Sequence, residues 1–174
     1  MIWIVMIAVM VLSMIIQARL KSRFEKYSEV PTGLSGAEVA QRMLQAHGIH
    51  DVNIVSIEGT LTDHYNPQTK TVNLSHDVYY GRNVAAAAVA AHECGHVVQH
   101  ATGYAPLRLR TAMVPVLTFT NSWISWVLLA GLIFYQAFPS LLWIGILLFA
   151  LTTVFSFVTL PVEINASARA VQWL

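Results

Sequence analysis

The chain has 174 residues, of which 56% are hydrophobic and 11% are charged, with a formal net charge of +1 and a mean hydropathy of +0.57. A soluble domain carries about 25% charged residues, so this composition excludes an ordinary soluble globular protein and indicates a protein of the lipid bilayer. No basic patch with interleaved aromatic residues is present, which argues against a nucleic-acid-binding protein.

The first expected element is an apolar helix at the N-terminal end. Residues 2–20 would rise about 28 Å as a helix, close to the thickness of about 30 Å of a hydrocarbon core. No Lys or Arg precedes this segment, no small-x-small cleavage site follows it, and a basic cluster comes after it. These features favour an uncleaved transmembrane anchor at residues 1–20 over a cleaved signal peptide.

Residues 21–110 form the polar part of the chain and are predicted to fold as one catalytic domain. Ser35 and Glu38 have the spacing of a capping box, so we expect an amphipathic helix over residues 35–47. The residues that follow carry strand and turn signals, which indicates a domain of the α+β class.

A small sheet and a long helix are expected in the rest of this domain. Residues 51–58 and 70–74 favour strands, and a turn signal lies between them, which predicts a hairpin around residues 57–74. An alanine-rich helix is expected over about residues 83–101, with Asn83 as its N-terminal cap.

Two further apolar segments follow the polar domain. Residues 111–138 and residues 140–160 can each span a bilayer, and Pro139 separates them. Neither segment contains a charged residue or a histidine, which argues against a transporter or channel subunit. Residues 161–174 are predicted to form a short cytoplasmic helix.

The basic residues predict the orientation of the chain. All ten Lys and Arg lie in residues 17–110 or 162–174, and the connector between the second and third spans carries no charge. With three spans, these two segments face the same side. The positive-inside rule therefore predicts a multi-pass protein of the cell membrane whose polar segments and active site face the cytoplasm.

The alanine-rich helix contains His92-Glu93-Cys94-Gly95-His96, which matches the HExxH pattern of zinc hydrolases. His92 and His96 project from one face of a helix, so both rings can reach one Zn²⁺ ion at about 2.0–2.1 Å. Glu93 lies beside the first ligand and is the predicted general base. Cys94 is the single cysteine, and such a residue is more often a buried apolar side chain than a metal or redox group.

A zinc site needs a third protein ligand. The three-histidine pattern HExxHxxGxxH fails here because residue 99 is Gln and residue 102 is Thr. Glu163 is the only acidic residue after Glu93, and it lies on the same predicted side of the membrane as the motif. We therefore predict Glu163 as the third ligand; the alternative is an interfacial carboxylate paired with Arg169.

His100 competes with Glu163 as a ligand but is disfavoured. It lies one turn beyond His96 and is rotated by about 40°, and three histidines at successive i+4 steps on a straight helix cannot easily surround one ion. His64 remains an alternative participant in the active site, against the more ordinary role of a hydrogen-bonding or exposed residue.

Four stretches carry a resemblance to a known family: they are GLSGAEVAQRML, GTLTDHYNPQTKTVNLS, VYYGRNVAAAAVAAHECGHVVQH and LPVEINASARA. They resemble the neutral zinc metallopeptidases of bacterial membranes, which are similar in plan to the HtpX and CAAX-prenyl endopeptidases. The resemblance implies a gluzincin-like site with His92, His96 and Glu163 as ligands and Glu93 as base. The related proteases place an Asp four residues after the ligand Glu; here Ser167 stands there and cannot supply the same charge.

We expect a membrane-embedded zinc metalloendopeptidase with about three transmembrane helices and a small zincin-like α+β domain. Zinc-activated water would attack the peptide carbonyl while Glu93 takes its proton and later passes it to the leaving amine. The expected partners are peptide or membrane-protein substrates and the bilayer, and the strand at residues 70–74 would pair with an extended substrate. The candidates for oxyanion stabilisation or support of the ligands are His64, Tyr79, Tyr80, Arg169 and Ser167.

The alternative function is a zinc-binding membrane scaffold without significant proteolysis. The change Glu93→Gln separates the two, because an enzyme would keep zinc and lose proteolysis whereas a scaffold would keep its activity. The oligomeric state is left open by the sequence. Members of the family continue into further apolar sequence, so the chain is either a shortened member or part of a longer protein.

Overall fold

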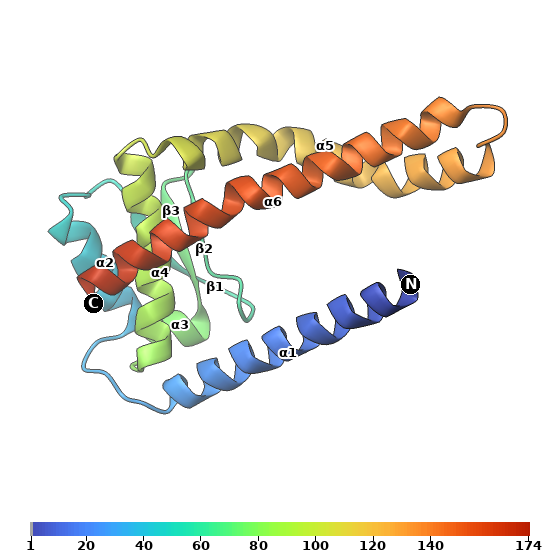
Figure 1. The fold of residues 1–174 in the computed structure, drawn as a ribbon. Coiled ribbons are helices and arrows are strands. Elements are labelled where there is room, and N and C mark those ends of the chain that lie inside the picture. Colours follow the sequence, from blue (N-terminus) through green and yellow to red (C-terminus); the bar gives the residue numbers. More distant parts are fainter. Residues whose placement is uncertain (1) are drawn as a thin grey trace. The chain divides into compact units, whose positions relative to one another are not determined.

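A computed structural model describes residues 2–174, and residue 1 of the predicted anchor lies outside the described residues (Figure 1). Two compact units are present: one contains the described residues up to Val97 together with Arg169–Leu174, and the other contains Val98–Ala168. The fold is α+β and mostly helical. The elements in chain order are α1 (Ile2–Ser28), α2 (Gly36–Ala46), β1 (Asn53–Ile57), β2 (His64–Asn66), β3 (Thr71–Ser75), α3 (His76–Tyr80), α4 (Val84–Ala101), α5 (Ala105–Ile133) and α6 (Pro139–Trp173).

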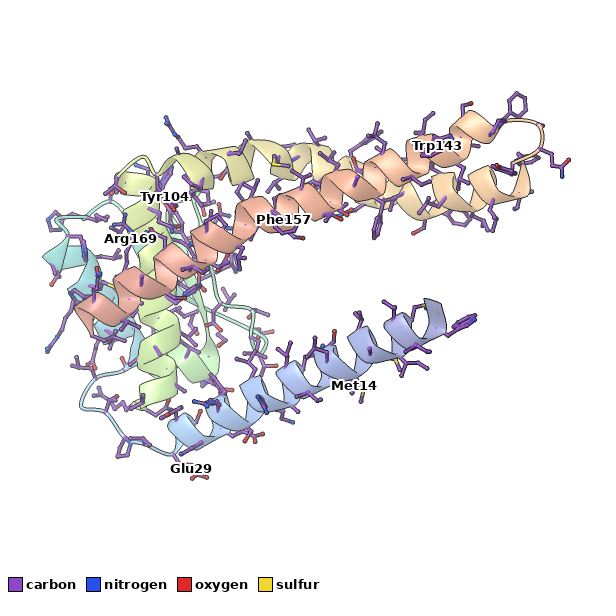
Figure 2. The ribbon with its side chains drawn as sticks, viewed as in Figure 1. Met14, Glu29, Tyr104, Trp143, Phe157 and Arg169 are labelled. Atoms are coloured by element: carbon purple, nitrogen blue, oxygen red, sulfur yellow. The ribbon has the colours of Figure 1, made fainter. Side chains whose placement is uncertain are left out.

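Helix α1 belongs to the first unit and is exposed at every residue from Trp3 to Leu20. Its apolar side chains, Met14 among them, project on all sides of the helix (Figure 2). An isolated helix that is apolar all round needs lipid around it, as in a membrane span. The helix continues past the predicted end of the anchor as far as Ser28, so the basic residues that follow the apolar segment lie on the same helix.

Helix α2 begins at the predicted capping box. The backbone N–H of Glu38 donates to the Ser35 hydroxyl at 3.2 Å, and the backbone N–H of Ser35 donates to the Glu38 carboxylate at 2.7 Å. Two otherwise unpaired backbone donors are thereby satisfied, which fixes where the helix starts. Arg82 binds the same carboxylate at 3.1 Å and so joins the start of α2 to the segment before α4. The apolar side chains that α2 buries are Val39, Ala40, Met43 and Leu44.

The sheet has three strands in the order β1-β3-β2. β3 pairs with β2 in antiparallel fashion and with β1 in parallel fashion. The prediction of a hairpin between the strands at residues 51–58 and 70–74 is therefore wrong, because these strands are parallel and the antiparallel partner of β3 is β2, which was not predicted. Val72 and Leu74 of β3 are fully buried, since alternate side chains of a strand project to the same face. β3 is thus the strand that attaches the sheet to the core.

Helix α4 is the central helix of the first unit and is lined by small residues. Its predicted cap is confirmed, because the Asn83 side-chain oxygen accepts from the backbone N–H of Ala86 at 2.8 Å. A side chain on Gly36 of α2 would place its Cβ 2.2 Å from the carbonyl oxygen of Val78 and 3.3 Å from that of Ala86. Only glycine allows α2 to approach α3 and α4 this closely, which leaves α4 well buried.

The second unit contains the end of α4, helix α5 and most of α6. α5 and α6 lie side by side and are joined by a short connector (Figure 1). A Cβ on Gly131 would lie 2.8 Å from the backbone of Leu142, and a Cβ on Gly145 would lie 2.5 Å from the Leu128 side chain. Glycine at such a crossing permits close backbone packing, which is a common arrangement between membrane helices.

Three of the described helices are long and apolar enough to cross a membrane: α1, α5 and α6. Both predicted spans after the polar domain are therefore matched by helices. Pro161 lies inside α6, so the span predicted at residues 140–160 and the helix predicted at residues 161–174 are continuous. The fold is that of an α+β membrane protein with about three transmembrane helices.

Candidate metal centre

The two histidines of the HExxH motif lie one turn apart on the same face of α4. The ring centroids of His92 and His96 are 4.9 Å apart and the ring planes are inclined by 85°. This is the arrangement that a spacing of four residues predicts on a helix. His92 is half-buried, whereas Glu93 and His96 are only 8% exposed. A half-buried and a buried imidazole therefore lie next to a buried carboxylate.

Glu163 lies close to this histidine pair. The ligand atoms that His92, His96 and Glu163 can offer, one from each residue, all lie within 4.8 Å of one another. Ligand atoms bound to one zinc ion at about 2.0–2.2 Å are separated by about 3.3 Å, so small side-chain movements would complete a coordination shell. Two imidazoles and one carboxylate are a donor set that suits zinc. The group can therefore bind a metal ion.

Gln99 of α4 binds the segment of α6 that carries Glu163. The Gln99 side-chain N–H group donates to the backbone oxygen of Val162 at 2.7 Å and to the side-chain oxygen of Asn165 at 3.1 Å. Gln99 is completely buried. From the sequence, Gln99 served only to exclude a third histidine. The signal in the sequence is a polar residue on an apolar part of the motif helix, one turn beyond His96.

Arg110, near the start of α5, was also missed. Its guanidinium lies 3.7 Å from the Glu163 carboxylate, and both side chains are about one-third exposed. From the sequence, Arg169 was the expected alternative partner of this carboxylate, because it follows Glu163 on the same predicted helix. Arg169 lies half-buried on α6, and Figure 2 labels it there. The positive charge of Arg110 comes from a different helix and could not be placed from the sequence.

The other candidate residues lie on three different elements. His64 on β2 contacts the carbonyl oxygen of Thr62 at 2.7 Å and the Asn73 side chain at 3.3 Å. Tyr79 and Tyr80 pack edge to face on α3, with ring centroids 4.8 Å apart. Their part in stabilising an oxyanion remains a prediction, as do those of Arg169 and of Ser167, which is exposed on α6.

The prediction that the strand at residues 70–74 adds a substrate strand is wrong. β3 is the middle strand, and both of its edges are already hydrogen-bonded, to β1 on one side and to β2 on the other. A strand can accept a further strand only at an unpaired edge. In the sheet that the structure describes, the outer strands are β1 and β2.

Cys94 behaves as the buried apolar residue that its position suggested. It is fully buried, and its sulfur lies 3.7 Å from the carbonyl oxygen of Ala40. Burial, with a smaller effect of the neighbouring Glu93, raises the pKa of the Cys94 thiol to about 12. Because the thiolate is the form that binds metals, the neutral Cys94 is a structural residue.

A family model described as "Putative neutral zinc metallopeptidase" matches residues 2–174, so the chain belongs to this family. The family implies Zn²⁺ as the metal, in agreement with the donor set of His92, His96 and Glu163. Among individual proteins, the chain is similar to "Putative membrane protease YugP" of Bacillus subtilis (strain 168). The two are 44% identical over 168 residues, which cover 95% of this chain and 74% of that protein. No solved structure matches the chain.

Proposed function

We propose that this protein is a membrane zinc metalloendopeptidase in which His92, His96 and Glu163 hold the metal and Glu93 is the general base. The observation that carries the proposal is the meeting of two imidazoles and one carboxylate beside a buried glutamate. Membership of a zinc metallopeptidase family and similarity to a protein named as a membrane protease support it.

The reaction is the addition of water across a peptide bond. A bound zinc ion would supply the Lewis acidity that polarises a carbonyl and makes a water molecule acidic near neutral pH. Glu93 accepts one proton of the attacking water as the remaining hydroxyl joins the carbonyl carbon. The same carboxylate then passes that proton to the amine nitrogen as the C–N bond breaks. Burial of Glu93 limits competition from bulk water for this proton.

We further propose that α1, α5 and α6 cross the cell membrane and that the metal centre faces the cytoplasm. The support is the absence of Lys and Arg from residues 111–161, while all ten lie before or after this stretch. A site next to the bilayer favours membrane proteins and peptides near the membrane as substrates. An extended substrate segment would have to pair with β1 or β2, because β3 is already paired on both edges.

The change Glu93→Gln tests the proposal directly. It keeps the size and the polarity of the side chain but removes the base, so we expect zinc content to stay unchanged and peptide cleavage to fall by about 10²–10⁴-fold. Zinc content would be measured by elemental mass spectrometry and cleavage with a membrane-protein substrate. The control is Glu58→Gln, at an exposed glutamate of the same unit. Undiminished cleavage in the Glu93 variant would overturn the assignment of the base, whereas wild-type biological activity without cleavage would favour the zinc-binding scaffold.

A further inference from the structure

Gln99 joins the helix that carries the two histidines to the turn of α6 that carries Glu163. We propose that Gln99 is a positioning residue, which fixes the third ligand relative to the first two through the backbone and side chain of α6. This inference rests on the proposed function, because it concerns the ligand role of Glu163. It is carried by three observations, which are the two hydrogen bonds of Gln99, its complete burial, and the position of Pro161.

The contacts of Gln99 lie on both sides of Glu163 in the sequence. Val162, whose backbone oxygen accepts at 2.7 Å, comes directly before Glu163, and Asn165, whose side-chain oxygen accepts at 3.1 Å, comes two residues after it. A single planar amide that binds two points of one helical turn restrains both the rotation and the height of that turn. The Glu163 side chain projects from this restrained turn.

Pro161 explains why α6 needs such a restraint at this place. Proline has no backbone N–H, so the carbonyl oxygen of Phe157 loses its usual partner four residues on, and the helix is weakened directly before Glu163. Without a further contact, the turn that follows the proline could swivel relative to the membrane-spanning part of α6. Gln99 binds the first residues after Pro161, where a contact is most effective against that movement.

On α4, Gln99 lies close to the histidine ligands. His96 and Gln99 are separated by about 4.5 Å along α4, and this part of the helix is continuous and buried. The two histidine ligands and the residue that holds the third ligand therefore belong to one short helical segment. Residues that orient ligands affect metal affinity although they do not touch the metal, and Gln99 has the placement for that effect.

A purely structural role makes a different prediction. A buried amide needs hydrogen-bond partners wherever it lies, so Gln99 could simply satisfy that need and stabilise the packing of the helices. In that case its removal would lower stability without changing how the metal is held. Metal affinity and the geometry of the coordination shell separate the two roles.

The test is Gln99→Met in the purified protein. Methionine has almost the same length as glutamine and tolerates burial, but it has no N–H donor. We expect the affinity for zinc, measured by competition with a chelator, to fall by about tenfold. With Co²⁺ in place of Zn²⁺, the visible absorption bands should change in position and intensity, because they depend on coordination geometry.

The matched control is Val98→Ala, one residue earlier on the same buried stretch of α4. Val98 is 3% exposed, and its truncation leaves both hydrogen bonds of Gln99 in place. We expect a lower melting temperature but the wild-type zinc affinity and Co²⁺ spectrum. An equal loss of affinity in both variants would overturn the inference, since it would show a general loosening of the helix. Should Gln99→Met fail to fold, Asn165→Ala removes one of the two hydrogen bonds and should weaken zinc binding by about threefold.

Glu163→Ala separates a failure of this inference from a failure of the proposed function. Full zinc retention in Glu163→Ala would remove Glu163 from the ligands and overturn the proposed function. Loss of zinc in Glu163→Ala together with wild-type affinity in Gln99→Met would overturn only the positioning role. Loss in both variants, with an unchanged Val98→Ala control, is the expected result.

Discussion

The charge of Arg110 acts directly on the carboxylate that we assign to the metal. Before a metal binds, the guanidinium 3.7 Å away partly neutralises Glu163 and so lowers the cost of keeping that carboxylate half-buried. Once a divalent ion is bound, the same guanidinium repels it. Arg110 therefore favours the metal-free state of the centre, and its effect on metal affinity is opposite in sign to that of Gln99.

We predict that Arg110→Gln binds zinc more tightly than the wild type, by about two- to tenfold. The magnitude is small because both side chains are about one-third exposed and solvent screens their interaction. Chelator competition at low and high ionic strength would measure it, and the difference should shrink at high salt. Arg108→Gln, at an exposed residue of the same helix, is the control. Weaker zinc binding in Arg110→Gln than in this control would show instead that Arg110 orients Glu163.

At the scale of the elements, the start of α2 depends on an ionised side chain. The backbone N–H of Ser35, followed by the charge of Arg82, lowers the pKa of Glu38 below its ordinary value. The folded state thus binds a proton less readily than the unfolded state. The contribution of Glu38 to stability is present above the pKa of the unfolded chain, about 4.3, and is lost as the pH falls through the lower pKa of the folded protein.

We predict that Glu38→Gln removes this part of the acid dependence of stability, because glutamine keeps the capping contact without a titratable group. Ser35→Ala should destabilise the protein at neutral pH by about 1 kcal/mol, since it removes the cap itself. The melting temperature as a function of pH would measure both effects. Glu29→Gln, at an exposed glutamate outside the capping box, should follow the wild type throughout. The same acid dependence in Glu38→Gln and the wild type would contradict the assignment.

The sequence predicted those elements whose signals are local. The starts of α2 and α4 were predictable because Ser35 and Asn83 form hydrogen bonds within their own first turns. The parallel pairing of β1 with β3 was not predictable, because it depends on contacts between strands separated by β2, a strand of three polar or aromatic residues. The span at residues 140–160 and the helix at residues 161–174 were expected to be separate, but α6 is continuous because Pro161 at that boundary removes only one hydrogen bond of the helix.

The residues of the metal centre also include some that could be predicted from the sequence and some that could not. The histidine pair could be predicted from its spacing alone, and Glu163 by elimination, because no other acidic residue follows Glu93. Gln99 and Arg110 could not be predicted, since their roles depend on which residues of α6 lie beside them in space. A glutamine on an apolar helix and an arginine near the start of a span have many ordinary explanations until those neighbours are known.

At the scale of the whole molecule, we infer that the bilayer around the proposed spans affects the position of Glu163. α6 has 35 residues; its apolar part, residues 140–160, is about 31 Å long, close to a hydrocarbon core of about 30 Å, and the rest continues beyond it. A span whose apolar stretch becomes longer than the surrounding hydrocarbon core responds by tilting. No loop interrupts α6 between its membrane-spanning part and Glu163. Tilting of the helix would therefore move the turn that carries this residue.

We predict that peptide cleavage in reconstituted vesicles depends on the length of the lipid acyl chains and is greatest at an intermediate length. The measurement compares vesicles of short, intermediate and long acyl chains at equal protein content. The Gln99→Met variant should be more sensitive to chain length than Val98→Ala, because its ligand turn is held less firmly. Activity that is independent of chain length in all three proteins would contradict the prediction.

Because α6 is continuous, the lipid bilayer can affect, through its thickness, the turn that carries Glu163, in addition to solvating the apolar side chains. Under the proposed function, a metal ligand on the same helix as a membrane span would make cleavage depend on the thickness of the membrane. Cleavage would then be confined to membranes that match the spans. The same enzyme would stay inactive while it passes through, or is misplaced in, a bilayer of another composition, without the need for a separate inhibitor or a removable propeptide.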